Sequence, residues 1–579
     1  MNNKTYVKIL SLMFVGFCIA GCNSVGSSFS DSANYDSLDT SSAKVAPSNH
    51  IIASNPVIKH PFPQYEIMPH YVLADGSSAI YPESRSDADV VAFYDYWKSS
   101  YIAEAGTIEG HKLYRVRYGK IGTSDANVTV SEGIGYGMLI SVMMAGPHDP
   151  DAQDIFNGLF RYTKAHPSTN DSRLMAWRQP KLPTQCDCAA FDGDADIALA
   201  LVLANEQWGS SGDINYIKEA RTIIAGIEEN MIGQNSHLPM LGDWVGSNAE
   251  HYNQWTPRSS DFMFDNFRGF SFITADHAYW DNVITKSHMV INHIQSQYSP
   301  VTGLLPDFMQ GTALNNIQPV FAPFPNGKNY FLEGVNDPDY YYNAGRDPWR
   351  IGVDALLNKD SASLTEVRKM SNWIKNSTNG NANDIHIGYY LNGNPIKSGS
   401  TSFFMAPFGV AAMTGGEAQQ SWLNSIYNAV KAKHEKYYED SVNLLSLLIM
   451  TGNYWGIDGK TPPPPPPAPV NYKLTIISSN QGFQIMDISN VTESSGKLDY
   501  VDNGETQIYD KSHMVYGNQI KKIHEKNDLV LTWRGYGDNN YPIKSCPPFN
   551  FTANTNITIN FNGSTNNGTC TITQGTHTK

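Results

Sequence analysis

The sequence predicts a mainly helical body followed by a smaller β domain. Between about residues 60 and 457, apolar residues recur three and four positions apart, which is the spacing of amphipathic helices. Six consecutive prolines, Pro462 to Pro467, then form a stiff extended spacer. After them come short runs of β-branched and aromatic residues separated by Asn, Gly and Ser turns. The proline run therefore marks a domain boundary.

Helical patterns recur through the body. In the segment 214–229, Ile217, Ala220, Ile224 and Ile227 fall on one helical face, and Arg221 is the one polar residue among them. Further helices are expected at 138–145, 197–205, 276–297, 364–375, 419–433 and 440–450.

The tail shows the alternation of short strands and turns. Strands are expected at 472–477, 484–488, 529–533 and 557–561, which suits a small β-sandwich. This composition fits a carbohydrate-binding module, in which exposed aromatic rings stack on sugar faces. An interaction or spacer domain is the open alternative, because Trp533, Tyr536 and Tyr541 fit a core as well as a surface.

The composition of the 579 residues is that of a globular protein. Hydrophobic residues make up 41% and aromatic residues 12%, against 17% charged residues, which excludes a mostly disordered chain. The formal net charge of -14 would repel nucleic acid and anionic lipid surfaces. A neutral or cationic partner fits this charge better.

The first residues resemble an export signal. Two lysines precede an apolar run, Ile9 to Ala20, that is too short to span a bilayer as a helix. The run leads into Ile19-Ala20-Gly21-Cys22, which resembles the bacterial lipobox, where the signal is cleaved before a cysteine that receives lipid. We expect a lipoprotein signal peptide at 1–21, lipidation of Cys22, a flexible tether at 22–57, and anchoring to the bacterial cell envelope or cell surface. The alternative is an ordinary signal peptide with a chance cysteine.

The four cysteines beyond Cys22 fall into two pairs. Cys546 and Cys570 lie in the β region of an exported chain, and we expect them to form a disulfide. Cys186 and Cys188 stand two positions apart, which we expect to be too close for a comfortable bridge. No other Cys or His stands beside them at zinc-ligand spacing, so we interpret them as structural or incidental to redox chemistry, and we expect no metal site.

Three alternate glycines open a helix in the segment from Ser131 to Met138. Glycine is costly at helical positions, so another backbone or a ligand must approach closely there. Glu132 lies at this point. A glutamate near a helix start is more often a capping carboxylate than an acid catalyst, and the local pattern leaves both roles open.

Three carboxylates at alternate positions, Asp192, Asp194 and Asp196, lead into an apolar helix. Like charges this close raise one another's pKa or need donors and cations around them. A calcium loop of the EF-hand type is excluded. Counted from Asp192, its sixth position is Ile197 instead of Gly and its twelfth is Leu203 instead of Glu.

The stretch from Ala190 to Trp208 resembles the signature of glycoside hydrolase family 8, departing from it at Phe191, where Ser or Thr is usual. Residues 131–137 resemble the family segment that bears the general acid, and residues 438–453 resemble its closing helix. The resemblance spans about residues 60–457. It implies an all-α (α/α)6 toroid of six inner and six outer helices, a cleft for a β-linked glycan, and hydrolysis with inversion.

These observations together give the expected domain organisation. A glycoside hydrolase domain would occupy 58–458, a Pro-rich linker 459–470, and a β-sandwich-like accessory domain 471–579.

The resemblance also implies catalytic roles. Glu132 would be the general acid, and Asp192 would hold the distorted sugar at the cleavage subsite. Many relatives carry their base as Asp in a Tyr-Asp-Ala-x-Arg motif, whereas the segment starting at Tyr342 reads Tyr-Asn-Ala-Gly-Arg, and Asn343 cannot accept a proton usefully. A subgroup with Asn at this point has a Glu on the preceding loop, which resembles Glu333.

We therefore expect Glu333 to be the general base, with Asp337 and Asp339 as alternatives. The resemblance further implies substrate binding by Trp177, Trp244, Tyr342, Asn343 and Arg346. That subgroup includes chitosanases and enzymes of mixed-linkage β-glucan.

The expected function is endo-hydrolysis of chitosan or of a β-1,3-1,4- or β-1,4-glucan. We expect a monomer with a polysaccharide substrate and no cofactor. The first alternative is a non-catalytic surface glycan-binding lipoprotein, which Asn343 and the appended β domain make tenable. The second is a polysaccharide lyase on a similar toroid.

Overall fold

The computed structural model describes residues 58–67, 71–183, 185–274 and 276–457, the ten strands of the C-terminal region, and the segment 543–548. The chain divides into two compact units, Met1–Pro463 and Pro464–Lys579. The expected signal peptide, Cys22, the tether and the linker at 459–470 lie outside the described residues. No helix in the described part of the chain is both long and apolar enough to cross a membrane.

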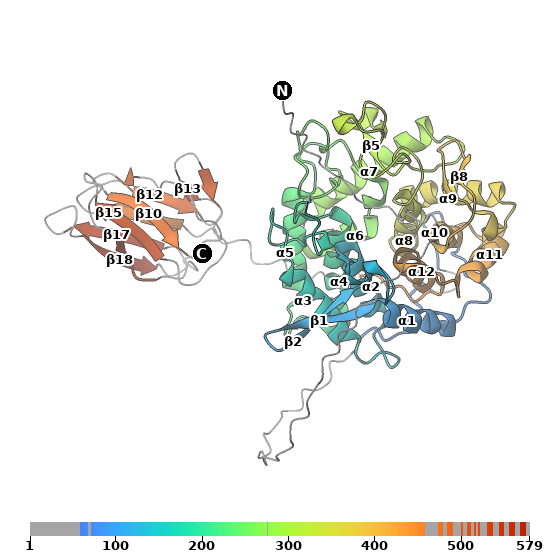
Figure 1. Ribbon diagram of the computed structural model, residues 1–579, viewed down its shortest axis with the longest axis horizontal. Coiled ribbons are helices and arrows are strands. Elements are labelled where there is room, and N and C mark those ends of the chain that lie inside the picture. The colour runs from blue at the N-terminus through green and yellow to red at the C-terminus, as the bar shows by residue number, and fades with distance from the viewer. Residues whose placement is uncertain are drawn as a thin grey trace, which may run out of the picture. The chain divides into compact units, whose positions relative to one another are not determined.

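The described part of the first unit holds twelve α-helices (Figure 1). They are α1 (Asp87–Tyr101), α2 (Ser131–Met144), α3 (Ala152–Ala165), α4 (Phe191–Trp208), α5 (Tyr216–Asn230), α6 (Phe264–Thr274), α7 (His277–Gln297), α8 (Asp347–Leu357), α9 (Ser361–Ser377), α10 (Ser402–Met413), α11 (Gln420–Val430) and α12 (Tyr437–Met450).

The even-numbered helices form a closed inner ring. Each contacts the next, and α12 returns to α2. Each odd-numbered helix packs outside a member of this ring, α1 on α12 and α3 on α2, and so on around the toroid. The predicted (α/α)6 toroid is confirmed. Every residue of α2 and of α10 is buried, as expected for helices enclosed on all sides by others.

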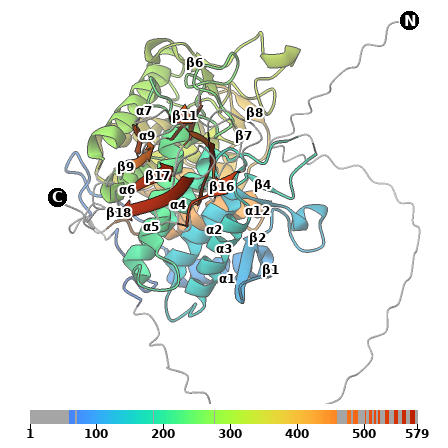
Figure 2. The same ribbon diagram turned by 90° about the vertical axis from the view of Figure 1, so that its left-hand side faces the viewer.

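The alternate glycines let α2 and α4 lie in close contact. The sequence predicted such a close approach, because glycine destabilises a helix unless another group needs the space. Figure 2 shows the two helices side by side. A Cβ atom on Gly135 would lie 2.7 Å from the Cβ of Asp196 and 3.1 Å from the carbonyl oxygen of Gly193. A Cβ on Gly133 would lie 2.7 Å from the hydroxyl of Tyr437. The glycines therefore bring two neighbouring helix starts together.

Short antiparallel strand pairs connect some of the helices. The pairs are β1 (Ile102–Ile108) with β2 (His111–Val116), β3 (Thr129–Val130) with β4 (Arg178–Gln179), β5 (Met309–Gln310) with β6 (Gln318–Pro319), and β7 (Ile387–Tyr389) with β8 (Pro395–Lys397). The pair β3–β4 leads directly into α2 and so helps to fix the start of that helix.

The described strands of the second unit form two four-stranded sheets and a hairpin, which confirms the predicted small β domain. One sheet has the order β11 (Tyr500–Val501), β10 (Phe483–Ser489), β15 (Val530–Gly535), β16 (Lys544–Ser545). The other has the order β12 (Thr506–Asp510), β9 (Lys473–Ser478), β17 (Thr555–Phe561), β18 (Gly568–Gln574), and the hairpin pairs β13 (Met514–Tyr516) with β14 (Gln519–Lys521).

A disulfide joins Cys546 to Cys570, as predicted. Cys546 follows β16 and Cys570 lies on β18, so the bridge ties an edge of one sheet to an edge of the other. Trp533 is buried, which favours a core role for this residue, whereas Tyr536 and Tyr541 lie outside the described residues.

Cys186 and Cys188 are also bridged, which corrects the expectation that they stand too close for a comfortable bridge. Their Cα atoms are 5.1 Å apart, within the ordinary range of disulfides despite the short sequence separation. The bridge closes the loop that leads into α4.

Candidate active site

The candidate site lies where the inner helices begin. Glu132 is the second residue of α2, Asp192 the second residue of α4, and Tyr437 the first residue of α12, while Arg346 directly precedes α8. Helix N-termini carry partial positive charge from unpaired N–H groups, and they favour acidic side chains in the first turn. The toroid therefore gathers carboxylates from different helices at one end of the ring.

Arg346 links the predicted catalytic carboxylates. Its Nη1 donates to Oε2 of Glu132 at 3.1 Å and to Oδ2 of Asp192 at 2.7 Å. The side chain of Arg346 is 1% exposed, and both carboxylates are 3% exposed. Buried charges require partners of opposite sign, so the two acids and the guanidinium stabilise one another in this arrangement.

Glu132 and Asp192 differ in pKa because their surroundings differ. Burial raises the pKa of Glu132 to about 7, and the negative charge of Asp192 adds to this rise, while Arg346 opposes it. Burial also disfavours ionisation of Asp192, but Arg258 and Arg346 outweigh it and hold its pKa below the ordinary value. Such a separation suits one carboxyl group to give a proton and the other to remain ionised.

Glu333 reaches the same cluster from the loop before α8. Its Oε2 accepts a hydrogen bond from Nδ2 of Asn343 at 2.9 Å, and Oδ1 of Asn343 accepts from Nη2 of Arg346 at 3.1 Å. A hydrogen-bonded chain thus connects Glu132, through Arg346 and Asn343, to Glu333. The side chain of Glu333 is partly exposed, unlike that of Glu132.

Burial raises the pKa of Glu333, and Asp337 and Asp307 raise it further, while the guanidinium of Arg258 lowers it. A carboxylate with a raised pKa is a stronger base once it is ionised. Glu333, the predicted base, therefore lies in the same hydrogen-bonded cluster as Glu132, and its assignment as the base stays a prediction.

The alternative bases have other partners. The carboxylate of Asp337 accepts three backbone N–H groups from residues 332–334 of its own loop. The backbone oxygen of Asp339 accepts a hydrogen bond from the backbone N–H of Asp307 at 2.8 Å. In the described structure neither side chain hydrogen-bonds to Arg346 or Asn343, so Glu333 fits the base position better.

Aromatic rings line one side of the cluster. Tyr342 stacks on Phe403 with ring centroids 5.4 Å apart, and Phe403 stacks on Tyr438 at 4.6 Å. The hydroxyl of Tyr438 donates to the backbone oxygen of Tyr342 at 2.8 Å. Flat apolar faces of this kind suit the C–H faces of sugar rings.

The two predicted subsite tryptophans lie at separate points of the site. Trp177 pairs through its backbone with Ser131, at the start of α2, but it is only 6% exposed. Trp244 is half-buried and packs edge-on against Tyr252, beside the apolar residues that precede Glu333. Trp244 therefore keeps more ring surface for a sugar than Trp177 does.

Sequence reasoning missed several residues of the cluster. Nη2 of Arg258 lies 3.1 Å from Oδ1 of Asp192, and the hydroxyl of Tyr437 donates to Oε1 of Glu132 at 3.1 Å. Ser260 accepts from Arg346 at 2.7 Å. Tyr437 is the first residue of α12, the helix that resembles the family's closing helix, and this resemblance was a sequence signal that could have identified Tyr437. Arg258 lies in an irregular loop and offered none.

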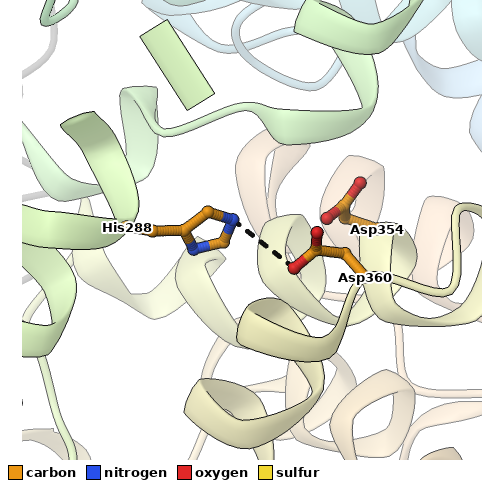
Figure 3. A group of neighbouring side chains, drawn as sticks. All are labelled: His288, Asp354 and Asp360. Atoms are coloured by element: carbon orange, nitrogen blue, oxygen red, sulfur yellow. Dashed lines mark ion pairs between the residues drawn. The ribbon is translucent and has the colours of Figure 1, made fainter. Parts of the chain in front are cut away.

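One group in the described chain has metal-ligand spacing: His288, Asp354 and Asp360 (Figure 3). Figure 3 shows the ring of His288 directed at Asp360, 3.6 Å from Nε2 to the carboxylate. Arg268 already pairs with Asp354 at 2.6 Å and with Asp360 at 2.9 Å, and Glu366 accepts from Nδ1 of His288. The carboxylates of this group are therefore already paired with the side chains of Arg268 and His288, and the group is better described as an ion-pair network.

Comparisons with known proteins agree with this geometry. Residues 70–452 match the model of the glycosyl hydrolases family 8. A β-glucanase of Niallia circulans is 42% identical over 404 residues, which cover 68% of this chain and 91% of that protein. An endoglucanase of Bacillus sp. (strain KSM-330) is 38% identical over 380 residues, covering 64% of this chain and 77% of that protein.

Solved structures give the same assignment. The structure of a β-1,3-1,4-glucanase from Paenibacillus sp. X4 is 40% identical, covers 69% of this chain and all of that one, and superposes with a TM-score of 0.62. A cold-adapted family 8 xylanase, 20% identical with a TM-score of 0.53, shares the fold. The chain therefore belongs to family 8 of the glycosyl hydrolases.

Proposed function

We propose that this glycoside hydrolase is an inverting endo-β-glucanase that cleaves β-1,4 bonds in a β-1,3-1,4- or β-1,4-glucan. The observation that carries the proposal is the hydrogen-bonded chain from Glu132 through Arg346 and Asn343 to Glu333. The relatives described above as β-glucanase, endoglucanase and β-1,3-1,4-glucanase support the substrate class.

Glu132 and Glu333 each have one task in this mechanism. Glu132, protonated because burial raises its pKa, gives its proton to the glycosidic oxygen as the bond to the anomeric carbon breaks. Glu333, ionised, takes a proton from a water molecule that attacks the anomeric carbon from the opposite face. Inversion of configuration follows, because the water enters opposite the leaving group.

Asp192 acts on the sugar without exchanging a proton. It stays ionised between Arg258 and Arg346, so its negative charge can stabilise the positive charge that develops on the sugar ring. It also offers acceptor oxygens to a hydroxyl of the distorted sugar. Tyr342, with Phe403 and Tyr438 behind it, supplies an apolar face for a neighbouring ring.

Chitosan is the second candidate substrate. The net charge of -14 favours a polycationic glycan through Coulomb attraction, and this attraction weakens as salt screens it. Cleavage of chitosan that falls steeply with salt, together with no cleavage of glucan, would replace the first proposal with this one.

The test measures reducing ends released from lichenan, carboxymethylcellulose and chitosan. We expect Glu132→Gln and Glu333→Gln to lower activity by about 10²–10⁴-fold, the usual contribution of a general acid or base. Asp339→Asn is the matched control and should stay near wild type. If the wild type releases no product from any glycan, the protein is a glycan-binding lipoprotein instead, and unsaturated products that absorb ultraviolet light would indicate a lyase.

Azide provides a separate test of the base. In Glu333→Ala the small anion fits into the space of the missing carboxylate and attacks the anomeric carbon without needing a proton acceptor. We expect azide to raise the activity of this variant and to yield a glycosyl azide of inverted configuration. No effect of azide, combined with full activity of the variant, would remove Glu333 from the mechanism.

We also propose that the protein is exported, lipid-anchored through Cys22 and monomeric. The lipobox-like sequence supports the anchor. Mass spectrometry of the mature N-terminal peptide should find a diacylglyceryl group on Cys22, and Cys22→Ser should release the protein from the membrane fraction. An unmodified N-terminus elsewhere in the chain would contradict this proposal, and sedimentation tests the monomer.

A further inference from the structure

Asp337 holds the backbone on which Glu333 is carried. Its Oδ2 accepts the N–H groups of Leu332 at 2.6 Å and of Glu333 at 3.0 Å, and its Oδ1 accepts that of Gly334 at 2.8 Å. Three consecutive backbone donors thus converge on one carboxylate. Hydrogen bonds to a charged acceptor are about twice as strong as neutral ones, so this group fixes the local chain path firmly.

Asp337 is itself fixed to the body of the protein. Its backbone oxygen accepts from the N–H of Phe308 at 2.9 Å, and the oxygen of Asp339 accepts from the N–H of Asp307 at 2.8 Å. Asp307 in turn accepts the backbone N–H of Ala344 at 2.7 Å, next to Asn343. The loop that carries Glu333 and the residue that hydrogen-bonds its carboxylate are therefore attached to the same segment, 307–308.

An apolar anchor precedes Glu333. Phe331 and Leu332 are 2% and 7% exposed and pack with Phe308 in a separate apolar cluster. The hydroxyl of Tyr252 donates to the backbone oxygen of Phe331 at 2.9 Å. The backbone before Glu333 is thus packed in place, and the carboxylate of Asp337 binds the three N–H groups from Leu332 to Gly334, where the chain turns.

We propose that Asp337 is a positioning residue for catalysis, which places the backbone of Glu333 so that its carboxylate meets Asn343 and the attacking water. The inference rests on the proposed function, because it assumes that Glu333 is the general base. Asp337 reaches no reacting atom itself, since its oxygens are occupied by the loop N–H groups. A carboxylate acting only on loop stability would leave the turnover number unchanged.

The charge of Asp337 has a second, measurable effect. The groups that act on Glu333 are Asp337 and Asp307, which raise its pKa, Arg258, which lowers it, and the hydrogen bond from Asn343, which also lowers it. Tyr118 also lies within electrostatic reach of Glu333. Removing the negative charge of Asp337 therefore stabilises ionised Glu333, and the acid limb of the pH profile should move to lower pH.

The experiment compares Asp337→Ala and Asp337→Asn with Asp339→Asn as the matched control, all in the full chain. The kcat, the KM and the pH dependence of kcat/KM are measured on lichenan, with the melting temperature of each variant. We expect Asp337→Ala to lower kcat about 10²-fold with little change in KM, the cost of about 1 Å of misplacement. Asp337→Asn keeps the shape and one acceptor oxygen for the loop N–H groups, so its loss should be smaller than that of Asp337→Ala, with the acid limb displaced to lower pH.

Azide separates a positioning residue from the base. It should raise the activity of Glu333→Ala but not that of Asp337→Ala, because Glu333 still fills the space in the second variant. Stimulation of both variants alike would overturn the proposal.

Two further outcomes would also overturn it, and they are distinguishable. If Glu333→Gln is inactive while both Asp337 variants keep the wild-type kcat and acid limb, Asp337 only stabilises the loop and the proposed function stands. If Glu333→Gln is fully active, the base assignment fails, and the positioning role fails with it. Should Asp337→Ala not fold, the kcat and acid limb of Asp337→Asn decide.

Discussion

The hydroxyl of Tyr437 sets part of the pKa of the proposed general acid. It donates to Oε1 of Glu132 at 3.1 Å, which stabilises the ionised form and lowers the pKa of Glu132. Tyr437→Phe removes this donor but keeps the ring, which packs against Tyr118 with centroids 5.3 Å apart. The pKa of Glu132 should therefore rise while the surrounding packing is retained.

The size of this effect follows from the hydrogen bond. A bond to a charged group contributes about 1.5–3 kcal/mol, and a donor distance of 3.1 Å favours the lower end of this range. About 1.5 kcal/mol corresponds to about one pH unit. Because Glu132 must be protonated, we expect the basic limb of kcat/KM near the Glu132 pKa of about 7 in the wild type, and about one unit higher in Tyr437→Phe.

The assay is kcat/KM on lichenan from about pH 5 to about pH 9, with initial rates of reducing-end release. Tyr438→Phe is the control, because its hydroxyl donates to the backbone oxygen of Tyr342 and not to Glu132. Its basic limb should stay in place even if the rate changes. A basic limb of Tyr437→Phe that stays at the wild-type pH or moves down would refute this account of Glu132.

Three further changes have defined outcomes. Asp192→Asn removes the charge that raises the pKa of the acid, so the basic limb should move to lower pH, opposite to the first variant, with a lower kcat; an unmoved limb would argue against the coupling. Arg350→Met removes the guanidinium that forms an ion pair with the fully buried Asp196 at 2.6 Å, and it should lower the free energy of unfolding by about 3–5 kcal/mol. Denaturant titration measures this loss, and an unchanged midpoint would contradict the reasoning. Cys546→Ser with Cys570→Ser opens a bridge with a sequence separation of 24 and should destabilise the C-terminal unit by about 3 kcal/mol in calorimetry without changing kcat.

The outer helices were more accessible to sequence reasoning than the inner ones. α5 and α7 each carry one buried face, so their apolar period is visible, and both were predicted nearly in full. α10 is buried at every position and contains Pro407, so it has no polar face and no period, and it was not predicted. α3 does carry the period and could have been found. α4 begins at Phe191, earlier than its apolar run suggested.

Some residues of the site could be predicted from local sequence segments, whereas others come from distant parts of the chain and could not. Glu132 and Asp192 lie in recognisable local segments, so the sequence was sufficient to select them. Their partners come from far along the chain: Arg346 is 214 positions from Glu132, and Tyr437 is 305 positions from it. Only closure of the toroid brings these residues together. The same holds for Arg258, which lies in the loop before α6 and meets Asp192 at the start of the neighbouring helix α4.

The stereochemistry of the first product tests the central claim most directly. Glu132 and Glu333 are proposed to act on opposite faces of one glycosidic bond, with water as the only nucleophile. A time course of anomeric proton signals during hydrolysis of lichenan should show the α-anomer of the new reducing end first, followed by slow conversion to the equilibrium mixture. Initial appearance of the β-anomer would mean that configuration is retained through a covalent intermediate, and would contradict the roles given to both residues.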